Sequence, residues 1–138
     1  MLSSQLFFQF NSNIHNMKVL VVDDERDIQT LFEQRFRKEI REKRIEFIFA
    51  FSGEKALAYL EQKEHEVIII LSDINMPGMS GLELLKHIRQ KYLEPPPSVM
   101  MITAYSDSEN FNMAKLLGAD DFLTKPVDFT YLKEKLKI

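Results

Sequence analysis

The sequence contains no cysteine and no tryptophan, and it has only four glycines and five prolines among 138 residues. Without cysteine there is no disulfide framework, no cysteine-ligated zinc and no thiol nucleophile; nothing indicates an oxidising compartment, and we expect a cytoplasmic protein. The low content of glycine and proline excludes a low-complexity linker protein. No apolar run approaches the roughly 20 residues that span a bilayer, so we expect no membrane segment.

The sequence also lacks a large excess of charge of one sign, since it has 18 basic and 21 acidic side chains and a formal net charge of −3. This balance argues against a domain that holds nucleic acid on a basic surface, and we expect no direct nucleic-acid binding. A small acidic domain instead favours cations, or partners that carry basic patches. The length corresponds to one ordinary globular domain.

Residues 1–16 differ in composition from the rest of the chain. They contain Phe7, Phe8 and Phe10 but no lysine or arginine, so they lack the charged start of a signal peptide and the arginine-rich character of a transit peptide. We interpret 1–16 as an N-terminal extension that is disordered or arises from an upstream start codon, and 17–138 as the domain itself. Docking of the apolar side chains on this domain or on a partner is the alternative.

From Lys18 onward, short apolar runs alternate with amphipathic segments. The runs are nearly continuous or have a period of two, which is typical of buried strands, and they lie at 18–22, 45–51, 67–71, 99–103 and 120–124. Between and after them, apolar residues recur every three or four positions and predict helices at 28–40, 53–62, 82–92, 108–117 and 128–137. Five successive strand–helix units predict an α/β fold, a doubly wound parallel five-stranded sheet with helices on both faces.

In such sheets, ligands bind beyond the carboxyl ends of the strands. Four sequence blocks at predicted strand ends carry polar residues: VLVVDDE (19–25), SDINMPGMSG (72–81), MITAYSD (101–107) and GADDFLTKPVD (118–128). In their order and spacing, these blocks resemble the receiver domains of bacterial two-component response regulators, including the single-domain chemotaxis type. The resemblance extends from Lys18 to about Lys137 and implies the flavodoxin-like strand order 2-1-3-4-5.

The acidic residues in these blocks predict a metal site. If the first and third strands are neighbours, Asp23, Asp24 and Asp73 meet at one edge of the sheet, where their mutual repulsion costs free energy until a cation binds. Carboxylates together with water suit Mg²⁺, and Mn²⁺ could replace it. For the Asp23–Asp24 pair alone, a solvated turn or a favourable interaction with the dipole of the next helix is the alternative.

The resemblance also implies the chemistry of this edge. Asp73 is the expected phosphoacceptor, since a carboxylate can attack phosphorus and form an acyl phosphate. Lys125 and the metal are expected to neutralise the phosphoryl charge. The peptide bond between Lys125 and Pro126 is expected to be cis, and the backbone carbonyl of Asn75 is expected to bind the metal.

Further residues correspond to the family's switch. Thr103 is expected to donate its hydroxyl to the phosphoryl group, and Phe122 is expected to turn inward in response, which changes the surface formed by the fourth helix, fifth strand and fifth helix. A simple core role for Phe122 is the alternative. The small Ala104 leaves the phosphoryl group accessible, and the ring of Tyr105 is expected to obstruct the water that hydrolyses the acyl phosphate.

The resemblance therefore implies a phosphorylation-dependent signalling switch rather than an enzyme, with catalysis limited to its own phosphorylation and autodephosphorylation. A histidine kinase or histidine phosphotransfer protein is the expected donor, and an output protein or effector domain the expected target; homodimerisation stays open. One alternative is a Mg²⁺-dependent phosphohydrolase with an aspartyl nucleophile, which Asn75 disfavours because such enzymes carry a second acid there. The other is the receiver part of a longer regulator with an effector domain beyond Ile138.

Overall fold

A computed structural model of the chain describes residues 16–63, 67, 69–92, 96–104 and 107–138. Residues 1–15, which form nearly all of the predicted N-terminal extension, and Tyr105 lie outside the described residues. The strands are β1 (Met17–Val22), β2 (Ile45–Ala50), β3 (Ile69–Asp73), β4 (Ser98–Thr103) and β5 (Asp121–Thr124). The helices are α2 (Asp27–Arg35), α3 (Arg37–Arg41), α4 (Gly53–Lys63), α5 (Gly81–Lys91), α6 (Ser108–Leu116) and α7 (Phe129–Leu136).

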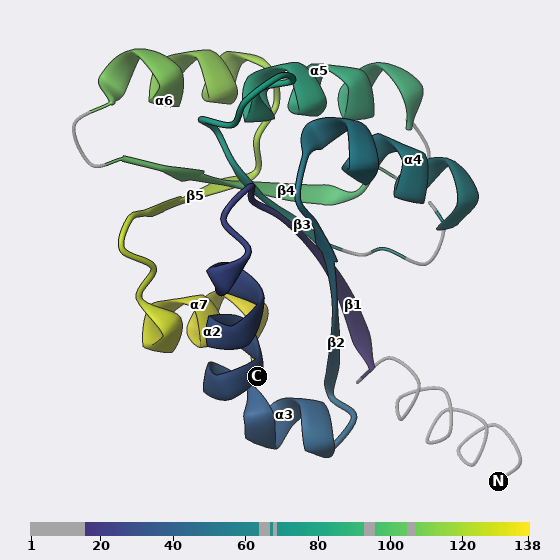
Figure 1. Ribbon diagram of the computed structural model, residues 1–138. Coiled ribbons are helices and arrows are strands. Elements are labelled where there is room, and N and C mark those ends of the chain that lie inside the picture. The colour runs from purple at the N-terminus through teal and green to yellow at the C-terminus, as the bar shows by residue number, and fades with distance from the viewer. Residues whose placement is uncertain (1–15, 64–66, 68, 93–95, 105–106) are drawn as a thin grey trace, which may run out of the picture.

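The five strands form one parallel sheet in the order β2-β1-β3-β4-β5, which confirms the predicted fold. Figure 1 shows α4, α5 and α6 on one side of the sheet and α2, α3 and α7 on the other. Because β1 and β3 are neighbours in the interior of the sheet, the residues that follow these two strands emerge side by side. No helix in the described part of the chain is long and apolar enough to cross a membrane.

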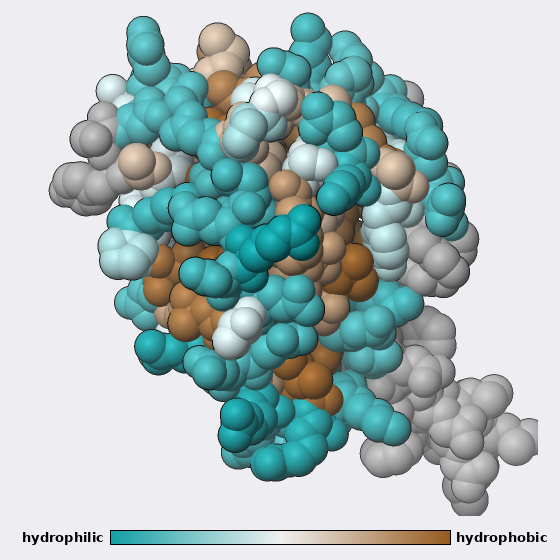
Figure 2. Space-filling view, in the orientation of Figure 1, coloured by the Kyte–Doolittle hydropathy of each residue, from teal (hydrophilic) through white to brown (hydrophobic). Residues whose placement is uncertain are grey.

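Alternate residues of each inner strand pack into two separate cores. In β1, Leu20 and Val22 belong to the core beneath α4, α5 and α6, whereas Val19 and Val21 belong to the core that contains Phe32 of α2. Burial on both faces explains why this strand is a continuous apolar run rather than an alternating one. On the side of the molecule seen in Figure 2, hydrophilic residues cover most of the surface and hydrophobic residues appear between them.

The predicted helix over residues 28–40 is divided at Phe36 into α2 and α3. Hydrogen bonds from Phe36 N to Phe32 O and from Ile40 N to Phe36 O continue across the division, but Phe36 departs from helical geometry, with φ −109° and ψ 20°. Its ring is fully buried and lies 4.8 Å from the ring of Phe47, centroid to centroid. Packing of this aromatic residue against β2, which periodicity does not reveal, accompanies the distortion.

The third strand lies two residues later than predicted, at Ile69–Asp73 instead of 67–71. Pairing with β4 continues to the register pair Asp73 and Ile102, so polar Ser72 and Asp73 are part of the ladder. Apolar character alone ends the run at Leu71 and misses this extension. As a result, the backbone of Asp73 is held by the sheet and not by the following loop.

At the opposite end of the sheet, Arg89 of α5 connects three segments. It donates to Gly118 O at 3.0 Å, to Pro97 O at 2.7 Å and to the carboxylate of Asp120 at 2.7 Å. The same oxygen of Asp120 accepts a hydrogen bond from Val99 N at 2.8 Å. This cluster joins the last turn of α5 to the beginnings of β4 and β5.

Glu39 of α3 is buried, and its Oε2 lies 3.0 Å from Lys133 Nζ of α7. Burial by itself raises the pKa of Glu39, but the hydrogen bond from Lys133, a hydrogen bond from its own backbone and the charges of Lys133 and Arg44 together lower it. The ionised form of Glu39 is therefore favoured by folding, and the pair ties α3 to α7.

Replacement of Glu39 by glutamine should lower the free energy of unfolding by about 1 kcal/mol near pH 7, because the charged partner of Lys133 is lost. Since the folded pKa of Glu39 lies below its ordinary value of 4.5, this stabilisation is present above that value and is lost as the pH falls through the folded pKa. Urea unfolding of both proteins near pH 7 and near pH 3 should show a smaller difference in acid. A difference that does not change with pH contradicts the interpretation.

Candidate functional site

Three aspartates meet where β1 and β3 end. Asp23 follows β1 and is 3% exposed, Asp73 closes β3 and is 4% exposed, and Asp24 is exposed. One carboxylate oxygen from each of the three lies within 4.8 Å of the others. Among the described residues, this is the one group of acidic or histidine side chains with the spacing to hold a metal ion. The sequence prediction that these three side chains converge agrees with this geometry.

Lys125, which follows β5, reaches across to the same place. Its Nζ lies 2.8 Å from Oδ2 of Asp73, although the two residues are far apart in the sequence. Partial burial by itself lowers the pKa of Lys125, but the hydrogen bond to Asp73 and the charges of Asp73, Asp23 and Glu25 together raise it. The amine is therefore held protonated beside the carboxylates. The peptide bond between Lys125 and Pro126 is cis.

Folding places Asp23 in an environment that disfavours its charge. The largest effect is burial, which raises the pKa of Asp23, and the charge of Asp73 raises it further. The hydrogen bond of 2.9 Å from Glu25 N to Oδ1 and the charge of Lys125 lower the pKa, but the net result is a rise. The candidate metal-ligand atoms of Asp23, Asp24 and Asp73 are all carboxylate oxygens. Such a set fits a hard divalent cation, whose charge would offset the repulsion among the aspartates.

The loop that follows Asp73 is closed on itself. Gly81 N donates to Ile74 O at 2.8 Å, and Ile74 N donates to Ile102 O at 3.2 Å. A Cβ atom at Gly81 would overlap the backbone oxygen of Asp73, so this position requires glycine. The loop holds Asn75 in an exposed position two residues beyond Asp73.

Thr103 and Ala104 lie at the end of β4, between the strands that supply Asp73 and Lys125. Thr103 is 4% exposed, and its hydroxyl donates to Ala104 O at 3.2 Å. Ala104 is exposed. The backbone of Thr103 also fixes that of Lys125, because Lys125 N donates to Thr103 O at 3.0 Å.

Phe122 of β5 is half-buried and packs against a residue that the sequence analysis did not single out. Its ring centroid lies 4.3 Å from that of Phe111 in α6, and Phe111 is itself 37% exposed. Phe122 thus contacts the helix that it is expected to influence. In the sequence, the aromatic Phe111 in the first turns of the predicted helix at 108–117 could have indicated this contact.

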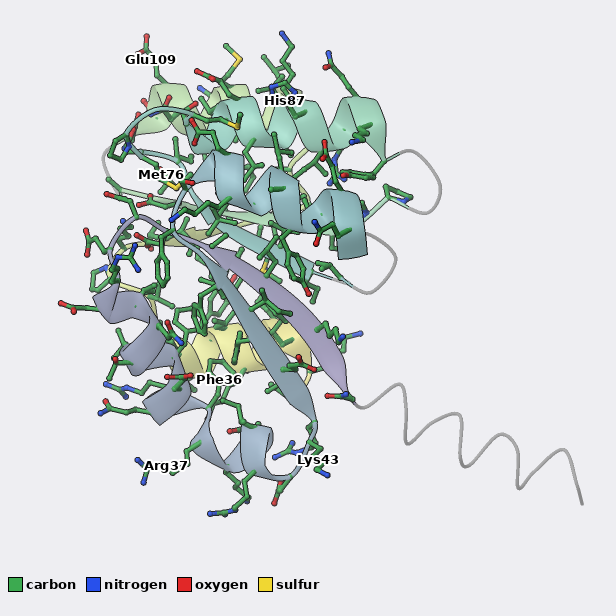
Figure 3. All side chains as sticks on the ribbon, turned by 45° about the vertical axis from the view of Figure 1, so that its right-hand side comes forward. Phe36, Arg37, Lys43, Met76, His87 and Glu109 are labelled. Carbon is green, nitrogen blue, oxygen red and sulfur yellow. The ribbon has the colours of Figure 1, made fainter. Side chains whose placement is uncertain are left out.

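The histidine among the described residues is not part of this site. Figure 3 shows His87 pointing outward from α5, whereas Met76, in the loop after β3, lies at the end of the sheet where the aspartates are.

Comparison with known proteins agrees with this arrangement. A family model described as the response regulator receiver domain matches residues 19–137. The alkaline phosphatase synthesis transcriptional regulatory protein PhoP of Bacillus subtilis is 35% identical over 111 residues, which cover 80% of this chain and 43% of that protein. The chain thus spans less than half the length of this relative.

Two solved structures are also similar. A response regulator receiver protein from Pseudomonas putida has a TM-score of 0.76 and 28% identity, covering 88% of this chain and 96% of the other. The second is described as a co-crystal structure of the Saccharomyces cerevisiae histidine phosphotransfer signaling protein Ypd1 and the receiver domain of its downstream response regulator Ssk1. It has a TM-score of 0.77 and 26% identity, and the match covers 90% of this chain and 88% of the other.

Replacement of Asp23 by asparagine should raise the free energy of unfolding by about 1 kcal/mol near pH 7 when a chelator removes divalent cations. Because burial raises the pKa of Asp23 in the folded chain, folding favours the protonated carboxyl group. The stability that this form provides is lost as the pH rises through the folded pKa, and the ionised carboxylate destabilises the fold at neutral pH. Thermal or urea unfolding in EDTA measures the change.

Asp27→Asn is the matched control, since Asp27 is exposed at the start of α2 and lies outside the group of three aspartates. This variant should gain no stability. Equal gains in the two variants, or a loss for Asp23→Asn in EDTA, would show that burial of the Asp23 charge and its repulsion by Asp73 do not limit the stability of the fold.

Proposed function

Since the chain belongs to the response regulator receiver domain family, a family of signalling modules and not of classical enzymes, we propose that it is a switch that is turned on by phosphorylation of Asp73. One observation carries the proposal: Lys125 Nζ lies 2.8 Å from Asp73 Oδ2 at the point where Asp23 and Asp24 also converge. A nucleophilic carboxylate, a cation and a candidate metal site therefore occupy one edge of the sheet.

In the phosphorylation step, a carboxylate oxygen of Asp73 attacks the phosphorus atom of a phosphohistidine or a small acyl phosphate. The new O–P bond forms as the P–N or P–O bond to the donor breaks, and the leaving group keeps that electron pair. Lys125 stays protonated and exchanges its contact with the carboxylate for one with a phosphoryl oxygen. Support comes from the raised pKa of Lys125, since the hydrogen bond to Asp73 and the charges of the neighbouring carboxylates favour the protonated amine before the reaction.

Mg²⁺ would be held by the carboxylates of Asp23, Asp24 and Asp73 and by the backbone carbonyl of Asn75, and Mn²⁺ could take its place. When bound, the metal supplies positive charge toward the phosphoryl oxygens. The all-oxygen donor set and the exposed position of Asn75 are compatible with this role.

The phosphoryl group is read out through Thr103 and Phe122. Phosphorylation adds charge of about −1.5 to −2 and new acceptor oxygens, toward which the hydroxyl of Thr103 turns. In doing so it leaves its present acceptor, Ala104 O. Phe122 then changes its packing against Phe111, and α6 and the surface between α6 and α7 change with it. Because Phe122 has no hydroxyl group, packing alone sets the preference between its positions.

The proposed phosphodonor is a histidine kinase or a histidine phosphotransfer protein. Support comes from the similar yeast structure, which is named as a receiver domain together with the phosphotransfer protein Ypd1. The output partner is a separate protein or an effector domain that binds the α6–β5–α7 surface. Support comes from the apolar side chains that are exposed on α6 and α7, which would favour contact with a protein partner: Phe111, Met113, Leu116 and Tyr131.

Incubation with acetyl phosphate and Mg²⁺ should add one phosphoryl group to the wild-type chain, because a small acyl phosphate can replace the protein donor. Intact-mass measurement should find no adduct on Asp73→Asn, which keeps the shape of the side chain but lacks a nucleophilic carboxylate. EDTA should abolish the adduct on the wild type. An adduct of equal yield on Asp73→Asn, or none on the wild type with Mg²⁺, contradicts the proposal.

We also propose that Tyr105, two residues beyond Thr103 in the sequence, slows hydrolysis of the acyl phosphate by obstructing the attacking water. Tyr105→Ala should then lose its phosphoryl group faster than the wild type, by about threefold or more, after the donor is removed. The decay of the intact-mass adduct with time measures both rates. Tyr105→Phe keeps the ring and should decay like the wild type; an unchanged or slower rate in Tyr105→Ala rejects the hypothesis.

A further inference from the structure

Glu54 joins two loops at the carboxyl edge of the sheet through a hydrogen bond. One is the β2–α4 connection, which leads into Gly53 and Glu54 at the start of α4; the other is the loop between β3 and α5, residues 74–80. The carboxylate of Glu54 accepts a hydrogen bond from Met79 N at 3.2 Å. This contact joins residues 25 positions apart in the sequence.

The two loops approach each other closely at Gly53 and Gly78. A Cβ atom at Gly53 would lie 3.0 Å from the Cβ, Cγ and Sδ atoms of Met79. A Cβ atom at Gly78 would lie 2.9 Å from Oε2 of Glu54, and Gly78 also has a φ of +72°, which L-residues rarely adopt. The two glycines thus permit the approach that brings Met79 N to the carboxylate.

The loop of residues 74–80 begins directly after Asp73. Its start is fixed by the hydrogen bonds of Ile74 with Gly81 and Ile102. Its far end is fixed by Glu54 through Met79. Asn75 lies between these two anchors, and Met76 beside it is buried at the end of the sheet, as Figure 3 shows. The segment that carries the Asn75 carbonyl is thus bounded on both sides by hydrogen bonds.

We propose that Glu54 is a positioning residue for the divalent cation. By holding Met79 N, it keeps the 74–80 loop, and with it the backbone carbonyl of Asn75, in place relative to Asp23, Asp24 and Asp73. The inference rests on the proposed function, since it assigns Glu54 to the same metal site without placing it in contact with the metal. The part that matters is the acceptor oxygen of the side chain and not its negative charge.

A different role for Glu54 makes different predictions. An acidic residue in the first turn of a helix is favoured by the helix dipole. If Glu54 acted only in that way, its removal would lower the stability of the chain equally with and without Mg²⁺, and the affinity for Mg²⁺ would not change. The affinity therefore separates positioning of the loop from stabilisation of α4.

Three variants test the proposal. Glu54→Ala removes the acceptor, Glu54→Gln keeps an acceptor oxygen without the charge, and Glu61→Ala removes a carboxylate from the same helix without touching the 74–80 loop. Titration of each unphosphorylated protein with Mg²⁺, followed by amide NMR shifts, gives the dissociation constant. The Met79 amide shift in EDTA reports its hydrogen bond independently of the metal.

Glu54→Ala should bind Mg²⁺ about three- to tenfold more weakly than the wild type, because binding must then order the 74–80 loop at a cost of up to the free energy of the lost hydrogen bond. Its Met79 amide shift should differ from that of the wild type in EDTA. Glu54→Gln should stay within about twofold of the wild type in affinity and restore the Met79 shift, because its amide oxygen can accept the bond. Glu61→Ala should match the wild type in both measurements.

Equal weakening in Glu54→Ala and Glu54→Gln would overturn the proposal, because charge and not the hydrogen bond would then be responsible. Wild-type affinity in Glu54→Ala despite a shifted Met79 amide would also overturn it, since the loop would hold its position unaided. Absence of Mg²⁺ binding by the wild type is a separate result, which rejects the proposed metal site itself together with this inference.

Discussion

The ion pair between Lys125 and Asp73 spans the carboxyl edge of the sheet, from the residue that follows β5 to the last residue of β3. β4, which ends at Thr103, lies between those strands. The attraction holds two carboxylates that the fold removes from water, Asp23 and Asp73, close to one protonated amine. All of the proposed chemistry depends on this arrangement, because Asp73, Thr103 and Lys125 lie at the ends of three adjacent strands.

The two faces of the sheet differ in the packing that supports this edge. On the side of α2, α3 and α7, Phe32 and Phe129 lie 5.1 Å apart at near-perpendicular angles, within a group of buried or half-buried aromatic rings. On the side of α4, α5 and α6, the contact between Phe111 and Phe122 reaches the surface. Closely packed interiors resist small displacements, and surface contacts yield more readily. Under the proposed function, α6 is therefore the side on which a change at the site meets the less tightly packed contact.

Much of the fold follows from the period of its apolar residues, because strands buried on both faces and helices with one apolar stripe leave distinct patterns. Convergence of Asp23 and Asp73 followed from the strand order that the family resemblance implied. Periodicity could not show the division at Phe36, which accompanies packing against Phe47, or the extension of β3 to Asp73, which depends on pairing with β4. The contact of Glu54 with Met79 was equally hidden, since it is made between two loops distant in the sequence.

Arg89 and Asp120 act at the end of the sheet opposite to the aspartates. Through Gly118 O, Pro97 O and Val99 N they bind the last turn of α5 to the chain just before β5 and to the beginning of β4. Since Gly118 closes α6, this helix is anchored at its C-terminal end and is held at its other end by Asp107, which caps it three residues after Ala104. Arg89 therefore fixes the C-terminal end of α6 at the end of the sheet opposite to Asp23 and Asp73, whereas the N-terminal end of α6 begins only a few residues after Thr103.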